Sequence, residues 1–248
     1  MFQVKSTLVS FLGDEEKYPC HFCHKIGDEI VFDGERYIGR LCPDVWPMLT
    51  QKVAALHQAG PRYVEPHFYY PIWYVPPSIR DESRKKLDGL GFASVLKTHT
   101  EPRCHMANLV PSNAFKWPPH PERTVAKQIT VLCPDTRTSA VFVLEAFDLS
   151  EKGFDVPFFR RQMAILDRVL KDQPVPLEAI LERFSKSERD EIYPPLVEEL
   201  LIPLLEEVEL MGYLETTDGR AFVTKRGESK LEKFKQSLTQ EELDGLGM

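Results

Sequence analysis

The sequence lacks an apolar run of the roughly 18 residues that a helix needs to cross a bilayer. Residues 1–17 also lack the uninterrupted apolar stretch and the small-residue cleavage site of a secretory signal. We therefore expect no membrane span and a cytoplasmic location. The catalytic signatures Gly-x-Ser-x-Gly, Gly-x-Gly-x-x-Gly, His-Glu-x-x-His and the phosphate-binding P-loop do not occur either. The sequence alone therefore names no reaction and no substrate.

Basic charge is scarce in the C-terminal part of the chain. The formal net charge is −7, and residues 157–248 carry 13 Lys and Arg against 19 Asp and Glu, whereas residues 1–156 carry 18 against 19. No Lys or Arg occurs between residues 190 and 219. Because a surface that faces DNA needs cations to meet the phosphates, this charge distribution disfavours nucleic acid as a partner.

The five cysteines are an odd number, which favours reduced thiols or metal thiolates over a disulfide framework in a chain without a secretory signal. Four potential metal ligands occur within five residues, Cys20-His21-Phe22-Cys23-His24. Two more cysteines lie in identical tetrapeptides, Leu-Cys-Pro-Asp, at Cys42 and Cys133, and each follows an apolar run.

A Cys-x2-Cys turn presents two thiolates to one tetrahedral ion, so Cys20, Cys23, Cys42 and Cys133 form a candidate set of four ligands. The interval from Cys42 to Cys133 is much longer than in a zinc ribbon, which leaves the fourth ligand open. The substitutes are His24, His21, Cys104 and His105. Zinc suits mixed Cys and His ligands, whereas an iron–sulfur cluster favours cysteine alone. Buried cysteines without metal and thiol redox chemistry are the other readings.

The patterning predicts an α+β domain over residues 1–150. Strands are expected at residues 2–12, 25–32, 92–98, 125–133 and 139–147, with a tight turn at Asp33-Gly34. A helix is expected to start at Cys42 and to end at Gly60-Pro61, and a second one to cover residues 78–88.

The segment at residues 64–78 is rich in proline and aromatic residues. Its aromatic part, Phe68 to Tyr74, either seals the core or lines a pocket. In the second case His67 or His120 is a candidate general base, and the protein is an enzyme.

Three motifs of the N-terminal part carry a resemblance. They are the pattern Cys-His-x-Ile-Gly-Asp-Glu from Cys23 to Glu29, the Cys-Pro pair that opens a helix at Cys42, and the second Leu-Cys-Pro-Asp, which precedes an apolar strand. They resemble a small family of uncharacterised cysteine-containing proteins of anaerobic bacteria and archaea. The resemblance covers residues 1–60 and 125–147, with residues 61–124 as an enlargement. The resemblance implies that the cysteines of these segments belong to one group, and it implies no mechanism of action for the protein.

The C-terminal part resembles winged-helix domains over residues 157–238. Helical patterns at residues 159–170, 176–184 and 195–212 precede Gly212-Tyr213-Leu214-Glu215, a turn at Asp218-Gly219, and Val223-Thr224-x-x-Gly227, which opens a last helix. In winged-helix regulators the helix before the wing enters the major groove. Here that stretch carries five glutamates: Glu198, Glu199, Glu206, Glu207 and Glu209. The basic residues left for a duplex are Arg183, Lys186, Arg189, Arg220, Lys225 and Arg226.

Taken together, these patterns predict an N-terminal antiparallel sheet with a helix, followed by a C-terminal winged-helix domain. The first functional hypothesis is a cytoplasmic metal-binding adaptor or regulator that holds zinc and whose acidic module binds a protein or a second copy. The second is a transcriptional regulator that senses metal or redox state. The third is an enzyme with a pocket at residues 68–74.

Overall fold

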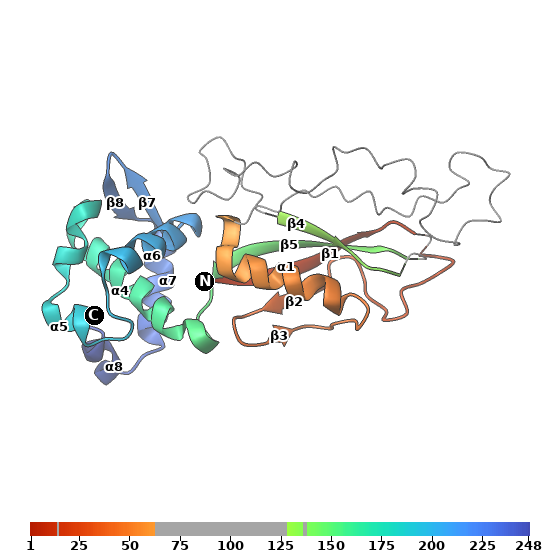
Figure 1. Cartoon of the computed structure of the whole chain (residues 1–248), viewed down its shortest axis with the longest axis horizontal. Coiled ribbons are helices and arrows are strands. Elements are labelled where there is room, and N and C mark those ends of the chain that lie inside the picture. Colours follow the sequence, from red (N-terminus) through yellow and green to blue (C-terminus); the bar gives the residue numbers. More distant parts are fainter. Residues whose placement is uncertain (14, 63–127, 136–137) are drawn as a thin grey trace, which may run out of the picture. The chain divides into compact units, whose positions relative to one another are not determined.

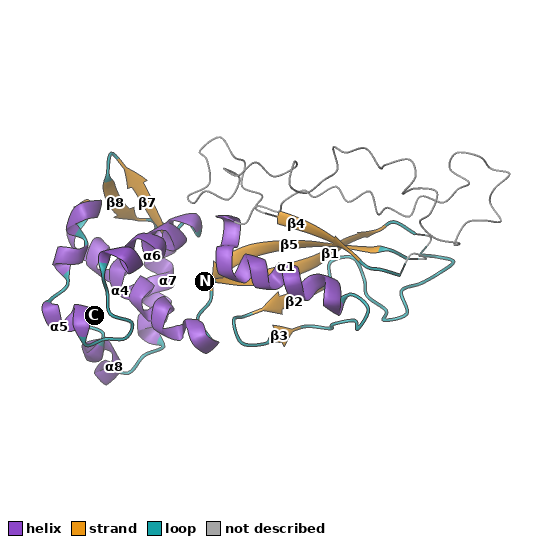
Figure 2. Cartoon of the chain, viewed as in Figure 1, coloured by secondary structure: helices purple, strands orange, loops and turns teal. Residues whose placement is uncertain are grey.

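The computed structural model describes residues 1–13, 15–62, 128–135 and 138–248, which contain helices and antiparallel sheets and confirm the α+β class. Figure 2 distinguishes the two kinds of element by colour. Residues Met1–Tyr63 and Ala126–Met248 belong to one compact unit. The expected helix at residues 78–88, the strand at 92–98 and the aromatic segment lie outside the described residues. The division into domains at residues 1–150 and 157–238 stays a prediction.

The first sheet is antiparallel, with the strand order β3-β2-β1-β5-β4. Its strands are β1 (Phe2–Phe11), β2 (Glu29–Phe32), β3 (Tyr37–Ile38), β4 (Gln128–Leu132) and β5 (Ala140–Leu149). The central pair runs from Phe2 opposite Leu149 to Phe11 opposite Ala140. Alternate side chains of β1 are buried from Phe2 to Leu8, as expected for a strand with one face on the core.

Helix α1 (Trp46–Ala59) covers one face of this sheet and buries Leu49, Val53 and Leu56 (Figure 1). The expected start at Cys42 is four residues too early. The amide of Trp46 donates to the carbonyl of Cys42 at 3.0 Å, so residues 43–45 form a turn that leads into the helix. A 3-10 turn, η1 (Gly60–Arg62), follows α1.

The C-terminal elements are η6 (Gly153–Asp155), α4 (Val156–Asp172), β6 (Val175–Pro176), η7 (Leu177–Ala179), η8 (Leu181–Arg183), α5 (Lys186–Asp190), α6 (Glu198–Leu210), β7 (Leu214–Thr217), β8 (Arg220–Val223), α7 (Lys225–Gln236) and α8 (Gln240–Gly245). Strands β6, β8 and β7 form a second antiparallel sheet in that order. Within the described part of the chain, every helix is too short or too polar to span a bilayer.

The helix expected over residues 176–184 is wrong. The chain there makes two short 3-10 turns, in which Ile180 donates to Leu177 and Arg183 donates to Ile180. The backbone of Phe184 is extended, and its side chain is buried in the core, so the helical path cannot continue past it. Ile180 and Phe184 are buried, but the chain between them makes 3-10 turns and not the expected α-helix.

Side chains at the two ends of the β1–β5 pair pack into different hydrophobic cores. Val4 and Leu8 pack with α1, whereas Phe2 and Leu149 join the core of the C-terminal helices. The N-terminal ammonium of Met1 lies 2.7 Å from Oε2 of Glu207 in α6. These contacts attach the start of the first sheet to the C-terminal helices.

Asp148 extends this attachment at the end of β5. Its carboxylate accepts hydrogen bonds from the hydroxyl of Tyr213 and, at 2.9 Å, from Nζ of Lys230. Burial raises the pKa of Tyr213, and Asp148 raises it further, so the phenol stays protonated and donates.

Substitution of Gly227 by Ala is expected to destabilise the protein by about 2 kcal/mol, because a Cβ there would lie 2.0 Å from the carbonyl oxygen of Tyr213. Gly245→Ala is the matched control, since it also lies in a helix but its Cβ would meet nothing within 4 Å. We expect that control to raise stability by about 0.5 kcal/mol. Urea unfolding of both variants measures the difference, and equal effects would contradict the close packing of α7 on Tyr213.

Candidate metal centre

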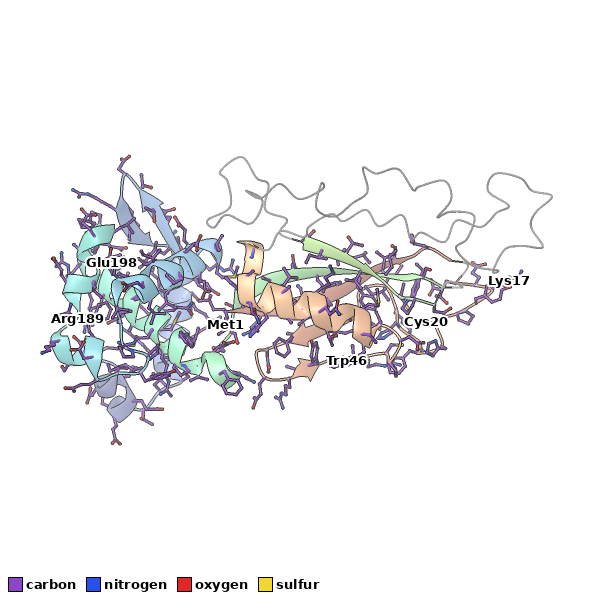
Figure 3. All side chains as sticks on the ribbon, in the orientation of Figure 1. Met1, Lys17, Cys20, Trp46, Arg189 and Glu198 are labelled. Carbon is purple, nitrogen blue, oxygen red and sulfur yellow. The ribbon has the colours of Figure 1, made fainter. Side chains whose placement is uncertain are left out.

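Three of the predicted ligands converge. Cys20, Cys42 and Cys133 line one small cavity of about 10 Å³, together with His21 and His24. The cavity lies where the loop after β1, the turn before α1 and the turn after β4 meet. Figure 3 labels Cys20 at the end of the sheet opposite Met1. Thiols more than 100 positions apart in the sequence are thus brought to one place.

The pairing of β1 with β5 explains this convergence. Beyond the last pair, Leu12 and Gly13 continue the ladder by donating their amides to the carbonyls of Ser139 and Thr138 at 3.1 and 3.0 Å. The hydroxyl of Thr138 then donates to the carbonyl of Tyr18 at 3.0 Å. These bonds hold the loop that carries Cys20 against the turn that follows Cys133.

The Cys-x2-Cys turn separates its two thiols. The amide of Cys23 donates to the carbonyl of Cys20 at 2.8 Å, and Cys23 takes a left-handed backbone conformation with φ of 54°. Cys20 faces the cavity, whereas Cys23 is exposed and is not one of the residues that line it. The structure therefore brings three of the four predicted cysteines together and leaves the role of Cys23 as a prediction.

His24 also lines the cavity. Its side chain is 2% exposed, and Nδ1 lies 3.1 Å from Oδ2 of Asp28. Its other nitrogen, Nε2, is buried and has no hydrogen-bond partner among the described residues. A buried nitrogen without a partner is costly, and a cation in the cavity would satisfy it.

Asp28 fixes which nitrogen of His24 carries the lone pair. The backbone amide of Lys25 and the His24 ring both bond its carboxylate and lower the pKa of Asp28, so the carboxylate stays ionised. An ionised acceptor beside Nδ1 favours the proton on that nitrogen and leaves Nε2 free to bind a metal. From the sequence, Asp28 was expected to lie on the solvated face of a hairpin, although its spacing of four residues from His24 was a usable signal of this contact.

A second group of donors shares Cys42. The donor atoms of His21, Cys42 and Asp44 all lie within 4.8 Å of one another. Nε2 of His21 is 3.3 Å from the Asp44 carboxylate and 3.9 Å from the sulfur of Cys42, and Nδ1 is 3.7 Å from Asp135. The two Leu-Cys-Pro-Asp segments therefore each place a thiol at the cavity and a carboxylate beside His21.

These two donor groups differ in exposure. The side chains of His21 and Asp44 are about half exposed, so water can satisfy them. Nε2 of His24 is shielded from water, and Cys42 is buried. Cys20, His24, Cys42 and Cys133, which we call the inner donor set, line the cavity together. Among the described residues, however, only the donor atoms of His21, Cys42 and Asp44 already lie within 4.8 Å of one another.

The surroundings of Cys133 discourage an isolated thiolate. Burial raises the pKa of the Cys133 thiol; the backbone amide of Asp135 opposes this rise, while Cys42, Asp135 and Cys20 add to it through nearby negative charge. Acidic groups that crowd together in this way stay protonated unless a cation compensates them. The predicted substitutes Cys104 and His105, and the candidate bases His67 and His120, lie outside the described residues.

Comparison with known proteins gives no neighbour: no family model, no curated protein and no solved structure matches this chain. Both resemblances drawn from the motifs therefore stay predictions.

In metal-free protein we expect Cys23 to be alkylated by iodoacetamide at least about tenfold faster than Cys133 at pH 8. Cys23 is exposed, whereas burial and the raised pKa keep Cys133 protonated. Peptide mass spectrometry over a time course measures both rates in one sample. Equal rates in the folded protein, with denatured protein as the reference, would contradict the partial burial of Cys133.

Proposed function

We propose that this chain binds one zinc ion through Cys20, His24, Cys42 and Cys133 and serves as a cytoplasmic metal-binding adaptor or regulator whose acidic C-terminal module binds a protein. The observation that carries the metal proposal is that His24, whose Nε2 is buried and has no hydrogen-bond partner among the described residues, lines the same cavity as three cysteines. Three sulfurs and one imidazole nitrogen are a common ligand set of structural zinc.

The size and the donors of the cavity favour a single ion. A space of about 10 Å³ is comparable to that taken by one water molecule, whereas an iron–sulfur cluster contains several iron and sulfide atoms. The mixture of sulfur and nitrogen also favours zinc over a cluster, which is usually held by cysteine alone. An iron–sulfur cluster is therefore the less favoured alternative.

Such an ion would act as a cross-link. It would join the loop after β1, the turn before α1 and the turn after β4, which belong to segments distant in the sequence. With four protein donors no coordination position is left for a substrate, which is typical of a structural site.

For the C-terminal module we propose a winged helix. Support comes from the strand order β6-β8-β7, with α4, α5 and α6 before a β7–β8 hairpin that turns at Asp218-Gly219. In this arrangement α6 takes the place of the helix that enters the major groove in DNA-binding members. Helix α6 carries glutamates and no Lys or Arg, so its field repels a duplex and suits a protein partner.

A metal- or redox-sensing DNA regulator is the alternative that the same strand order supports. It would need a different surface to approach the duplex, since the acidic face of α6 opposes phosphate. Homodimerisation through the module is a further alternative to binding a different protein.

Purified zinc-loaded protein is expected to contain about one zinc per chain. His24→Ala and Cys42→Ser are expected to lose most of it, because each removes a member of the inner donor set. Cys23→Ser is the matched control and should keep its zinc, since Cys23 is exposed. Elemental analysis after gel filtration measures the content.

Circular dichroism of each variant separates loss of metal from loss of fold. Full zinc in a folded His24→Ala variant together with loss in Cys23→Ser would contradict the inner donor set and favour four thiolates. Full zinc in all three variants would exclude both sets.

A further inference from the structure

The C-terminal module contains a groove of about 600 Å³ that is separate from the candidate metal centre. It is bounded by η7 and η8 on one side and by α6 on the other, with Arg189 of α5 and Thr216 of β7 also in its lining. Its apolar lining consists of Leu177, Leu181, Leu201, Ile202 and Leu205. Ile202 is 60% exposed, although it lies in the middle of a helix.

Carboxylates surround this apolar floor. The acidic residues in the lining are Glu178, Glu182, Glu198, Glu206 and Glu209, and Arg189 is the one basic residue among the lining residues. Glu198, Ile202 and Glu206 are four residues apart and therefore share one face of α6. The groove thus combines an apolar floor with a rim of negative charge.

We propose that this groove binds a basic amphipathic segment of a partner protein, with large apolar side chains on the floor and Lys or Arg side chains against the rim. The proposal deepens the proposed function, because it names the surface and the partner chemistry of the C-terminal module. It does not depend on the metal centre, which uses other residues.

Charge decides between the possible occupants. A second copy of the chain carries a net charge of −7 and would bring acidic surface against an acidic rim. Nucleic acid and acidic peptides are repelled for the same reason. A basic segment gains from the rim and can bury its apolar side chains beside Ile202, as amphipathic helices do in apolar grooves.

The test is a selection from a random 16-residue peptide library displayed on phage, with the full zinc-loaded chain as bait. Enriched peptides are expected to carry Lys or Arg around apolar residues spaced by three or four positions. The dissociation constant of a representative peptide is then measured by fluorescence anisotropy at low and high salt. Binding is expected to weaken at high salt because the rim contacts are screened.

Two groove variants, Ile202→Ser and the pair Glu182→Lys with Glu209→Lys, are expected to weaken binding at least about tenfold. Each has a control of the same chemistry outside the groove. Phe154→Ser removes an apolar side chain that is 94% exposed, and Glu215→Lys with Glu241→Lys reverses two charges elsewhere on the module. The controls are expected to bind within about twofold of the parent.

Several outcomes would overturn the proposal: no enrichment, enrichment of acidic or uncharged peptides, or groove variants that bind as the parent does. A stable dimer in sedimentation that Ile202→Ser dissociates would assign the groove to a second copy instead. Zinc content is measured in every variant. A variant that loses peptide binding but keeps its zinc has lost the groove contact alone. If zinc-free protein binds the peptide as the parent does, the groove proposal holds even where the metal proposal fails.

Discussion

The antiparallel pairing of β1 with β5 is the constraint on which the rest of the described structure depends. At one end, Phe11 opposite Ala140 brings the loop that carries Cys20 to the turn that follows Cys133. At the other end, Phe2 and Leu149 enter the core of the C-terminal helices. One strand pair therefore assembles the candidate metal centre and anchors the C-terminal module, and a shift of register by one residue would turn the buried side chains of β1 to the wrong face.

The proposal of the inner donor set rests on the cost of burying polar atoms. Nδ1 of His24 lies 3.1 Å from Oδ2 of Asp28, whereas Nε2 has no hydrogen-bond partner among the described residues, and His24 lines the same cavity as three cysteines. A thiol such as Cys133, whose pKa is raised by burial and nearby negative charge, gives up its proton when a cation arrives. The proposed zinc site thus draws on two separate features, a histidine beside a carboxylate and three cysteines that line one cavity.

Local patterns predicted much of the fold. The alternation of β1, the turn at Asp33-Gly34, and helices α4, α6 and α7 were readable because each depends on residues close in sequence. The helix over residues 176–184 was wrong: the chain makes two 3-10 turns there and becomes extended at Phe184, a difference that the local apolar pattern does not encode. At the site, the convergence of Cys20, Cys42 and Cys133 was predicted from residue type. The choice between Cys23 and His24 depends on which side chain the loop turns inward, and sequence spacing does not encode that.

The central claim concerns the atoms that surround one ion, so X-ray absorption spectroscopy at the zinc edge of the zinc-loaded full chain tests it most directly. The inner donor set predicts a shell of three sulfurs at about 2.3 Å and one nitrogen at about 2.0 Å, with the imidazole signature in the outer shells. A shell of four sulfurs would return Cys23 to the site and contradict the role of His24. A shell of oxygen and nitrogen atoms with one sulfur would instead favour His21, Cys42 and Asp44.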